Sequence, residues 1–300
     1  MAEVLDALKP TTGGRYADGT LGGAGHAAGM LAASSPTGWL FGCDRDGAAI
    51  EAARKRLTAS FAGRFEIRQG NFADMAGWIP VAACDGVLLD LGVSSPQLDA
   101  PERWFSFQHD GPLDMRMDTR QELTAAELIN RAGPDELARI FWEYGGERES
   151  RRLARALVRD REGRKFETTR QLADCIERLS PRRGKKAHPA TKIFQALRIA
   201  VNDELGSLKN GLEAASEILK PGGRLAIITF HSLEDRVVKE FGRERARGYS
   251  VPGGVDVPEL RQPRPPEMRW VTRKAILAGK AELHENPRSR SAQLRVLEKI

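Results

Sequence analysis

Residues 85–99, Asp-Gly-Val-Leu-Leu-Asp-Leu-Gly-Val-Ser-Ser-Pro-Gln-Leu-Asp, decide the fold. The apolar run at 87–89 is unbroken, which is typical of a parallel strand covered on both faces. Asp90 ends this run, and residues 91–92 turn the chain out of the sheet toward the Ser-Ser-Pro corner at 94–96. Ligands of open α/β sheets gather outside the carboxyl ends of the strands, so we expect a functional site here. The alternative is that Asp90 only caps the following turn.

Length and charge set the broad class of the protein. A chain of 300 residues predicts about two domains with a proper hydrophobic core. It has 47 basic and 41 acidic residues, so its net charge is +6, and its pI is about 9.4. This balance only mildly favours a polyanionic partner, because six excess charges are also compatible with an ordinary soluble surface.

The cysteines and the apolar segments predict a compartment. Cys43, Cys84 and Cys175 are too few and too scattered for a disulfide framework or a Cys-x-x-Cys metal site, which fits a reducing cytoplasm. The start of the chain has no basic leader followed by an apolar core, and no stretch reaches the roughly twenty apolar residues of a membrane span. We therefore expect a cytoplasmic protein without a membrane partner.

Strands and helices alternate from residue 15 to about residue 110, which predicts βαβ units and a parallel sheet. After that point the periodicity is helical up to residue 200, which predicts an all-helical insertion between strands of the sheet. The expected fold class is thus α/β with domain boundaries at 1–112, 113–206 and 207–300. The expected strands are 15–18, 39–43, 65–67, 85–90, 225–230, 270–276 and 292–296, and a long helix at 191–220 is expected to break near Gly206 or Gly211.

The insertion carries clusters of basic residues. Residues 181–189 form a basic loop with Pro and Gly, and further basic residues stand at 151–152 and 161–165. Such a charge run is either a solvated surface or a contact to nucleic acid.

The glycine-rich turn at 19–26 follows the first strand and opens a helix, as in nucleotide-binding sites. Residues 23–28 also satisfy the G-x-G-x-x-G/A dinucleotide pattern, so a NAD-linked oxidoreductase is an alternative. The strand, however, ends at Asp18, four residues before Gly23, whereas the first glycine of a dinucleotide turn directly follows its strand. S-adenosylmethionine fits better: Asp18 faces its positive amino-acid end, Asp44 accepts from both ribose hydroxyls, and Phe72 lies against adenine.

The Ser-Pro-Gln corner at residues 95–97 predicts transfer of a methyl group to an exocyclic amine of a base. Ser95-Pro96-Gln97 is a degenerate relative of the [D/N/S]-P-P-[Y/F] corner of enzymes that methylate exocyclic base amines. The N4 lone pair of cytosine is delocalised, so acceptors must surround the amine before it attacks the methyl group. Asp90, the Ser95 hydroxyl and the carbonyl groups up to Pro96 are the candidate acceptors. No metal is needed, and no cysteine is placed for attack on carbon.

His231 follows the strand at 225–230, and we expect it at the same edge of the sheet as Asp90. It is either a substrate contact or part of a helix cap in which Ser232 is the capping residue. The remaining histidines lack the spacing of metal ligands, so no metal site is expected.

Long motifs make the chain resemble the bacterial family of ribosomal RNA small subunit methyltransferase H, the cytosine-N4 methyltransferases of 16S rRNA. The resemblance covers almost the whole chain and is far more specific than a single glycine motif. The matching segments are 18–20, 25–26, 89–99, 105–107, 110–118, 188–191, 194–199, 230–236 and 286–291.

The resemblance implies a class I S-adenosylmethionine-dependent methyltransferase fold, Rossmann-like with an inserted helical domain for substrate recognition, and methylation of a cytosine in the decoding region of 16S rRNA. Transferred residue by residue, the family's cofactor contacts are Ala24, Gly25, His26, Asp44, Phe72, Asp90 and Gln97. The family usually has Gly at the position of Ala24, a small change if a backbone N–H makes the contact. A non-enzymatic RNA-binding assembly factor remains the third hypothesis, and the choice between monomer and homodimer stays open.

Overall fold

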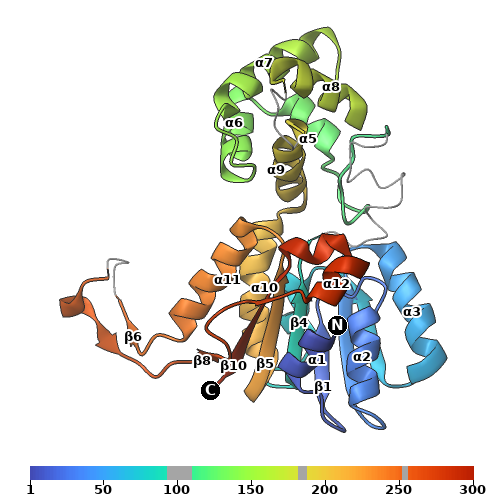
Figure 1. The fold of residues 1–300 in the computed structure, drawn as a ribbon, viewed down its shortest axis with the longest axis vertical. Helices are drawn as coiled ribbons and strands as arrows, with labels where there is room; N and C mark the ends of the chain where they lie inside the picture. The colour runs from blue at the N-terminus through green and yellow to red at the C-terminus, as the bar shows by residue number, and fades with distance from the viewer. Residues whose placement is uncertain (93–109, 182–187, 252–255) are drawn as a thin grey trace. The chain divides into compact units, whose positions relative to one another are not determined.

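A computed structural model of the chain describes residues 1–92, 110–181, 188–251 and 256–300, which belong to two compact units (Figure 1). The sheet unit comprises Met1–Gly92 and Leu205–Ile300, and the helical unit comprises Val93–Glu204. The helical unit therefore interrupts the sequence of the sheet unit, as the change in periodicity predicts.

The sheet unit contains a mainly parallel sheet, which confirms the predicted fold class. Its strand order is β3-β2-β1-β4-β5-β10-β8, with β9 paired to β10. The first five strands in this order are parallel, and β10 is antiparallel to its neighbours. The strands are β1 (Arg15–Asp18), β2 (Trp39–Asp44), β3 (Phe65–Gln69), β4 (Cys84–Asp90), β5 (Leu219–Thr229), β8 (Met268–Trp270), β9 (Ile276–Leu277) and β10 (Gln293–Lys299).

Both faces of the sheet are covered by helices. Within β4, Val87 and Leu89 pack into one core cluster and Leu88 into the other, and all three are fully buried. This explains the unbroken apolar run, because alternate residues of a strand point to opposite faces. One face is covered by α1 (Ala2–Leu8), α2 (Gly25–Ala33) and α3 (Gly47–Phe61), and the other by η1 (Phe72–Gly77), α10 (Glu204–Ile218) and α11 (Ser232–Arg245) (Figure 1).

The strand order reverses between β1 and β4. The chain runs from β1 outward through β2 to β3 and then returns to the opposite side of β1 as β4. In open α/β sheets, ligands bind at such a switch point, outside the carboxyl ends of the strands. We therefore expect a ligand site at the carboxyl ends of β1, β2 and β4.

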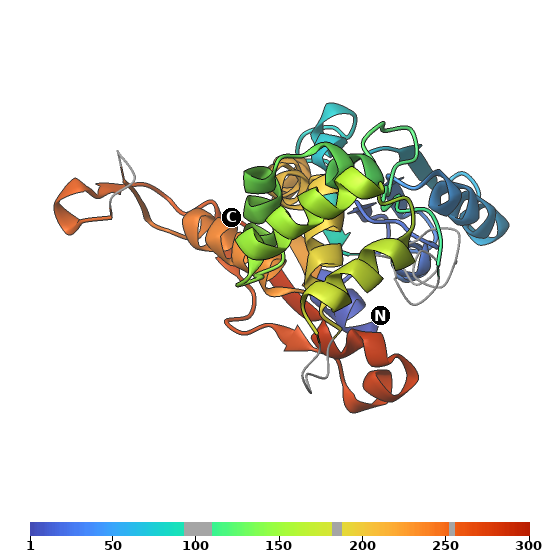
Figure 2. The same cartoon turned by 90° about the horizontal axis from the view of Figure 1, so that it is seen from above.

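The C-terminal part of the sheet differs from its prediction. The expected strand at 270–276 is wrong: β8 ends at Trp270, and a turn in which the Thr272 hydroxyl donates to the Lys274 carbonyl at 2.8 Å separates it from β9. The ion pair between the buried Asp235 of α11 and the partly buried Arg295 of β10, at 2.6 Å, holds that helix against the sheet. Two further strands, β6 (Tyr249–Ser250) and β7 (Gln262–Pro263), pair with each other away from the main sheet (Figure 2).

The helical unit has its own core. Side chains from each of its helices, together with Leu113 and Met115, form one buried cluster. Capping boxes at Thr124 and Thr168 start two of the helices, since each threonine accepts from the backbone N–H three residues on. The helices are α5 (Ala125–Arg131), α6 (Pro134–Glu143), α7 (Ser150–Gly163), α8 (Thr169–Leu179) and α9 (Ala190–Asn202).

The long helix predicted at 191–220 breaks at Asp203, not at Gly206 or Gly211, which both lie inside α10. Asp203 adopts a left-handed conformation with φ of 44°. The preceding Asn202 side chain accepts from the backbone N–H of Met117 and donates to the carbonyl of Met115, both at 2.8 Å. These contacts to a distant segment fix the end of α9, and Asp is one of the few residues that tolerate the left-handed region.

No helix in the described part of the chain is long and apolar enough to cross a membrane.

Candidate active site

Three carboxylates lie at the carboxyl ends of neighbouring strands. Asp18 ends β1, Asp44 ends β2 and Asp90 ends β4, and these strands are adjacent in the order β2-β1-β4. Carboxyl ends of parallel strands meet at one edge of a sheet, so the fold brings the three acids together as expected.

Thr20 connects two of these acids. Its backbone N–H donates to Oδ1 of Asp18 at 3.1 Å, and its hydroxyl oxygen accepts the backbone N–H of Asp90 at 2.6 Å. The backbone N–H of Gly22 donates to Oδ2 of Asp44 at 2.8 Å. The glycine-rich turn is therefore tied to all three strand ends. The role of Thr20 was missed by the sequence reasoning, although it stands within the Asp-Gly-Thr motif that supports the family resemblance.

The turn ends at Ala24, which has φ of 57° and is fully buried. Its backbone N–H donates to the carbonyl of Leu21 at 2.7 Å, so this group is already used within the turn. No side chain caps the N-terminus of α2, which begins at Gly25 and His26. The first backbone N–H groups of a helix lack partners inside the helix and carry the positive end of its dipole. Among the predicted cofactor contacts, Gly25 and His26 therefore offer backbone donors where Ala24 does not.

His26 and Asp90 face each other beside this turn. Nε2 of His26 lies 3.7 Å from Oδ2 of Asp90, which is too long for a hydrogen bond. Nδ1 of His26 and Oδ1 of Asp90 are buried and have no hydrogen-bond partner among the described residues. Burial lowers the pKa of His26 to about 4, and burial raises the pKa of Asp90 to about 7. Near neutral pH the imidazole is thus uncharged, and both groups have unused capacity for a ligand.

The pKa of Asp18 is raised in the same way as that of Asp90. Asp18 is 2% exposed, and burial raises its pKa to about 7, with the charges of Asp90 and Asp44 acting in the same direction. An acidic cluster of this kind is unfavourable unless a positive group is close to it. The site therefore suits a cationic ligand.

The cysteines near the sheet are not nucleophiles. Sγ of Cys43 lies 3.6 Å from the carbonyl oxygen of Gly19, and burial raises the pKa of this thiol well above its usual value. Burial also raises the pKa of Cys84 to about 12. Since the thiolate is the reactive form, neither residue supports attack on a carbon atom. Both cysteines and Cys175 are free and buried.

Phe72 starts η1 after β3 and packs partly into the core. A Cβ atom on Gly19 would lie 2.8 Å from Cβ of Phe72, and one on Gly211 would lie 2.2 Å from Cδ2 of its ring. Two glycines thus provide the space for this aromatic side chain between the glycine-rich turn and α10. Its proposed contact with adenine stays a prediction.

His231 is the N-cap of α11. Its Nδ1 accepts the backbone N–H of Glu234 at 3.4 Å, while Oε2 of Glu234 accepts the backbone N–H of His231 at 3.2 Å. The alternative of a helix cap is therefore confirmed, but the assignment of Ser232 as the capping residue was wrong, because Ser232 is already the first residue of the helix. Ile228 lies opposite Asp90 in the sheet, so His231 follows the neighbouring strand end, and the charge of Glu234 also raises the pKa of Asp90.

Three predicted site residues, Ser95, Pro96 and Gln97, lie outside the described residues.

Comparisons with known proteins identify the family of this chain. A ribosomal RNA small subunit methyltransferase H of Citrifermentans bemidjiense is 54% identical over 303 residues, covering 99% of this chain and 96% of that protein. Proteins of the same name from Geobacter sulfurreducens and Xanthomonas euvesicatoria pv. vesicatoria are 52% and 49% identical, covering 100% and 99% of this chain and 97% and 87% of those proteins. The model of the MraW methylase family matches residues 1–300, so the resemblance inferred from the motifs is confirmed and this chain belongs to the MraW methylase family.

Proposed function

We propose that this chain transfers a methyl group from S-adenosylmethionine to the N4 amine of a cytosine in the decoding region of 16S rRNA. The observation that carries this proposal is Asp90. It stands at the carboxyl end of the central strand β4, its Oδ1 is buried without a partner among the described residues, and its pKa is raised to about 7.

The residues around the switch point fit S-adenosylmethionine. Asp18 would hold the positive amino-acid end, and the uncapped N-terminus of α2 offers donors to the carboxylate of the same ligand. Asp44 accepts from the backbone N–H groups of Gly22 and Asp46, at 2.8 and 2.9 Å. In this proposal its carboxylate oxygens are also the acceptors for the two ribose hydroxyls. The partnerless Nδ1 of His26 is a further buried polar atom that a ligand would satisfy. When bound, S-adenosylmethionine supplies an electrophilic methyl group on a sulfonium centre.

Asp90 prepares the amine of the target base. The N4 lone pair is delocalised into the cytosine ring, and a hydrogen bond from N4–H to a carboxylate draws the nitrogen toward the geometry that attack requires. With a pKa near 7, Asp90 is ionised often enough to accept this hydrogen bond and is basic enough to take up the proton released. Ser95 and Pro96 are proposed as further acceptors, Gln97 as a cofactor contact and His231 as a substrate contact.

The choice of 16S rRNA as substrate rests on the family. The relatives named above are ribosomal RNA small subunit methyltransferases. The segment around Asp90 is one of the motifs by which this sequence resembles that family. In this proposal the enzyme acts in the cytoplasm, where the small subunit is assembled, with the helical unit as the recognition part. Membership in a methylase family favours this function over the oxidoreductase and over a binding protein without activity.

The test is an assay with the full chain, S-adenosylmethionine carrying a tritium-labelled methyl group, and either 16S rRNA transcript or small subunits. Nuclease digestion and mass spectrometry should find the label as N4-methylcytidine, and Asp90→Asn should remove it. Label at another base or another atom would contradict the proposal. If calorimetry shows binding of NADH and none of S-adenosylmethionine, the oxidoreductase alternative replaces it.

A further inference from the structure

Helix α7 and the loop before it carry a row of exposed arginines, which we call the arginine row: Arg148, Arg151, Arg155 and Arg159. Arg151, Arg155 and Arg159 are spaced four residues apart within α7, which places them along one side of the helix, and Arg148 stands in the loop two residues before the helix begins. At a rise of 1.5 Å per residue the three helical arginines span about 12 Å, enough for a few nucleotides of a strand.

The arginines of this row form no salt bridge with another described residue, whereas neighbouring arginines do. Arg139 pairs with Glu143 at 2.9 Å, and Arg152 pairs with Glu149 at 2.7 Å. The guanidinium of Arg161, on the same helix, donates to two backbone carbonyl groups instead. The positive charge of the row is therefore available to a partner.

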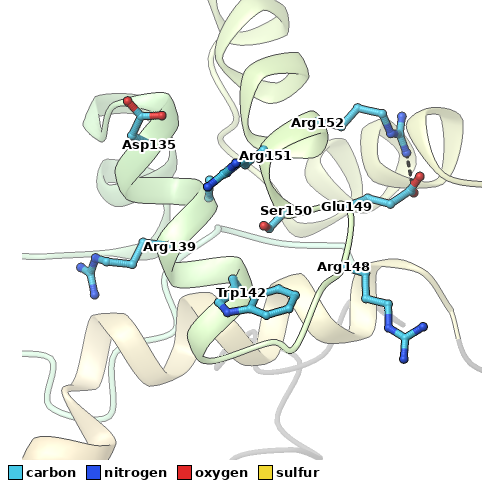
Figure 3. Close-up of a pocket in the computed structure, with 9 residues that line it drawn as sticks. Asp135, Arg139, Trp142, Arg148, Glu149, Ser150, Arg151 and Arg152 are labelled. Carbon is cyan, nitrogen blue, oxygen red and sulfur yellow. Dashed lines mark hydrogen bonds and ion pairs between the residues drawn. The ribbon is translucent and has the colours of Figure 1, made fainter.

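An exposed tryptophan stands beside the row. Trp142 of α6 is 58% exposed and is the only aromatic residue among the large exposed hydrophobic side chains of the described part. It lines a cavity of about 770 Å³ together with Arg148 and Arg151. Figure 3 shows Arg139 and Arg148 on either side of the indole and Arg151 across from it.

The charges around this cavity favour an anionic partner. Four arginines line it against two carboxylates, Asp135 and Glu149. Arg152 is paired with Glu149 and Arg139 with Glu143, which leaves Arg148 and Arg151 against Asp135. A flat exposed aromatic ring next to guanidinium groups is the combination that binds single-stranded nucleic acid, because bases stack on the ring and phosphates contact the cations.

We propose that the arginine row and Trp142 bind a single-stranded segment of RNA, with phosphates along the row and one unpaired base stacked on the indole. This inference rests on the proposed function, since it takes the RNA substrate as the occupant. It assigns to named residues a binding surface within the helical unit, apart from the strand-end carboxylates.

The first test removes charge from the row. Arg151→Ala/Arg155→Ala is compared with Arg54→Ala/Lys55→Ala, which removes two equally exposed charges from α3. Binding of a fluorescein-labelled oligocytidine 12-mer and of a transcript of the 16S decoding region is measured between 50 and 200 mM salt, roughly the range over which phosphate contacts change affinity most. Each lost contact to a single strand lowers the slope of log K against log salt by about 0.7, so the row variant should lose about 1.4 in slope and about 25-fold in affinity at 0.1 M salt. The α3 variant should match the wild type.

The second test removes the stacking surface. Trp142→Leu should bind the 12-mer about 5- to 100-fold more weakly, with an unchanged salt slope, while Trp142→Phe should retain most of the affinity. Melting temperature and S-adenosylmethionine affinity should stay at wild-type values in all variants, which separates lost binding from lost folding.

The inference is overturned if the row variant keeps the wild-type salt slope, or if Trp142→Leu binds RNA as the wild type does. It is also overturned if the row variant binds RNA as the wild type does and loses only the binding of polyglutamate. The same holds if it loses only self-association, measured by ultracentrifugation. The two proposals fail separately: a wild-type enzyme that methylates 16S rRNA while the variants bind normally contradicts this inference alone, whereas row-dependent RNA binding without any methyl transfer contradicts the proposed function alone.

Discussion

Replacing Asp18 by Asn should stabilise the ligand-free protein at alkaline pH and weaken its binding of S-adenosylmethionine. Asp18 is 2% exposed, and burial raises its pKa to about 7. Its recorded hydrogen bonds come from the backbone N–H and the hydroxyl of Thr20, both to Oδ1. An amide oxygen accepts these bonds equally well, so the substitution removes the charge and keeps the local geometry.

The magnitude follows from the pKa. A rise from 3.8 to about 7 is roughly three units, and each unit corresponds to about 1.36 kcal/mol. The folded state holds this proton more tightly than the unfolded state, so the associated stability is fully present below pH 4 and is lost as the pH rises through 7. Because Asp90 titrates in the same range, the share of Asp18 is smaller than the full value of about 4 kcal/mol. We expect Asp18→Asn to gain about 2–4 kcal/mol at pH 8, or about 3–6 °C in melting temperature for a chain of 300 residues, and little at pH 4.

Calorimetric melting of the ligand-free protein at pH 4.5, 6 and 8 measures this gain, and titration calorimetry measures the affinity for S-adenosylmethionine. That affinity should fall about 10- to 100-fold, because a hydrogen bond to a charged group is lost. Asp46→Asn is the matched control: Asp46 is also buried, but it caps α3 through Ala48, and Asn caps a helix as well as Asp does. If the gain of Asp18→Asn is the same at pH 4.5 and at pH 8, burial of a carboxylate is not its cause and the reasoning is refuted.

Three further predictions concern the rest of the site. Asp90→Asn should lower the rate of methyl transfer at least about 100-fold in single-turnover kinetics at saturating S-adenosylmethionine, in addition to any loss of cofactor affinity that calorimetry measures; transfer at the wild-type rate would remove Asp90 from the mechanism. Gly211→Ala places a Cβ atom 2.2 Å from the Phe72 ring and must displace it, so urea unfolding should show a loss of about 1–3 kcal/mol and S-adenosylmethionine should bind more weakly; unchanged affinity would argue against Phe72 as the adenine contact. His231→Ala should cost about 1 kcal/mol of stability through the lost cap, whereas His231→Asn should restore it; if His231→Asn also transfers methyl groups at the wild-type rate, His231 serves only as a cap.

The sheet could be predicted from the sequence because β1, β2 and β4 each contain a short apolar run closed by an acid, whereas β3 alternates apolar and polar residues. Asp18, Asp44 and Asp90 each end such a run, and the structure ends β1, β2 and β4 at these residues. Burial on both faces requires the unbroken pattern at 87–89, so local composition and tertiary position agree there.

The break at Asp203 could not be predicted in the same way. Glycines are the usual helix breakers, which directed the prediction to Gly206 and Gly211. The actual break depends on the side chain of Asn202, which bonds to residues 115 and 117, more than eighty positions away. A sequence pattern does not contain this contact.

The cap of α11 was predictable in principle. In a capping box the N-cap stands three residues before the Glu that completes it. Counting back from Glu234 gives His231, not Ser232, and the structure has this arrangement. The prediction followed the general preference for Ser over His at N-caps. The three-residue spacing before Glu234 would have identified the N-cap correctly.

The same acids that fit the site to its ligand make the ligand-free protein less stable. Asp18, Asp44 and Asp90 stand at adjacent strand ends, and the pKa values of Asp18 and Asp90 near 7 mean that ionising either of them is opposed in the folded state. A cationic ligand at this edge removes that opposition, because it favours the charged carboxylates that burial disfavours. Part of the attraction for S-adenosylmethionine is therefore the relief of an unfavourable arrangement that the fold maintains, as is common where function requires a destabilised site. Stability gained by neutralising Asp18 and affinity lost by the same substitution both depend on the charge of one carboxylate, which burial disfavours and the ligand favours.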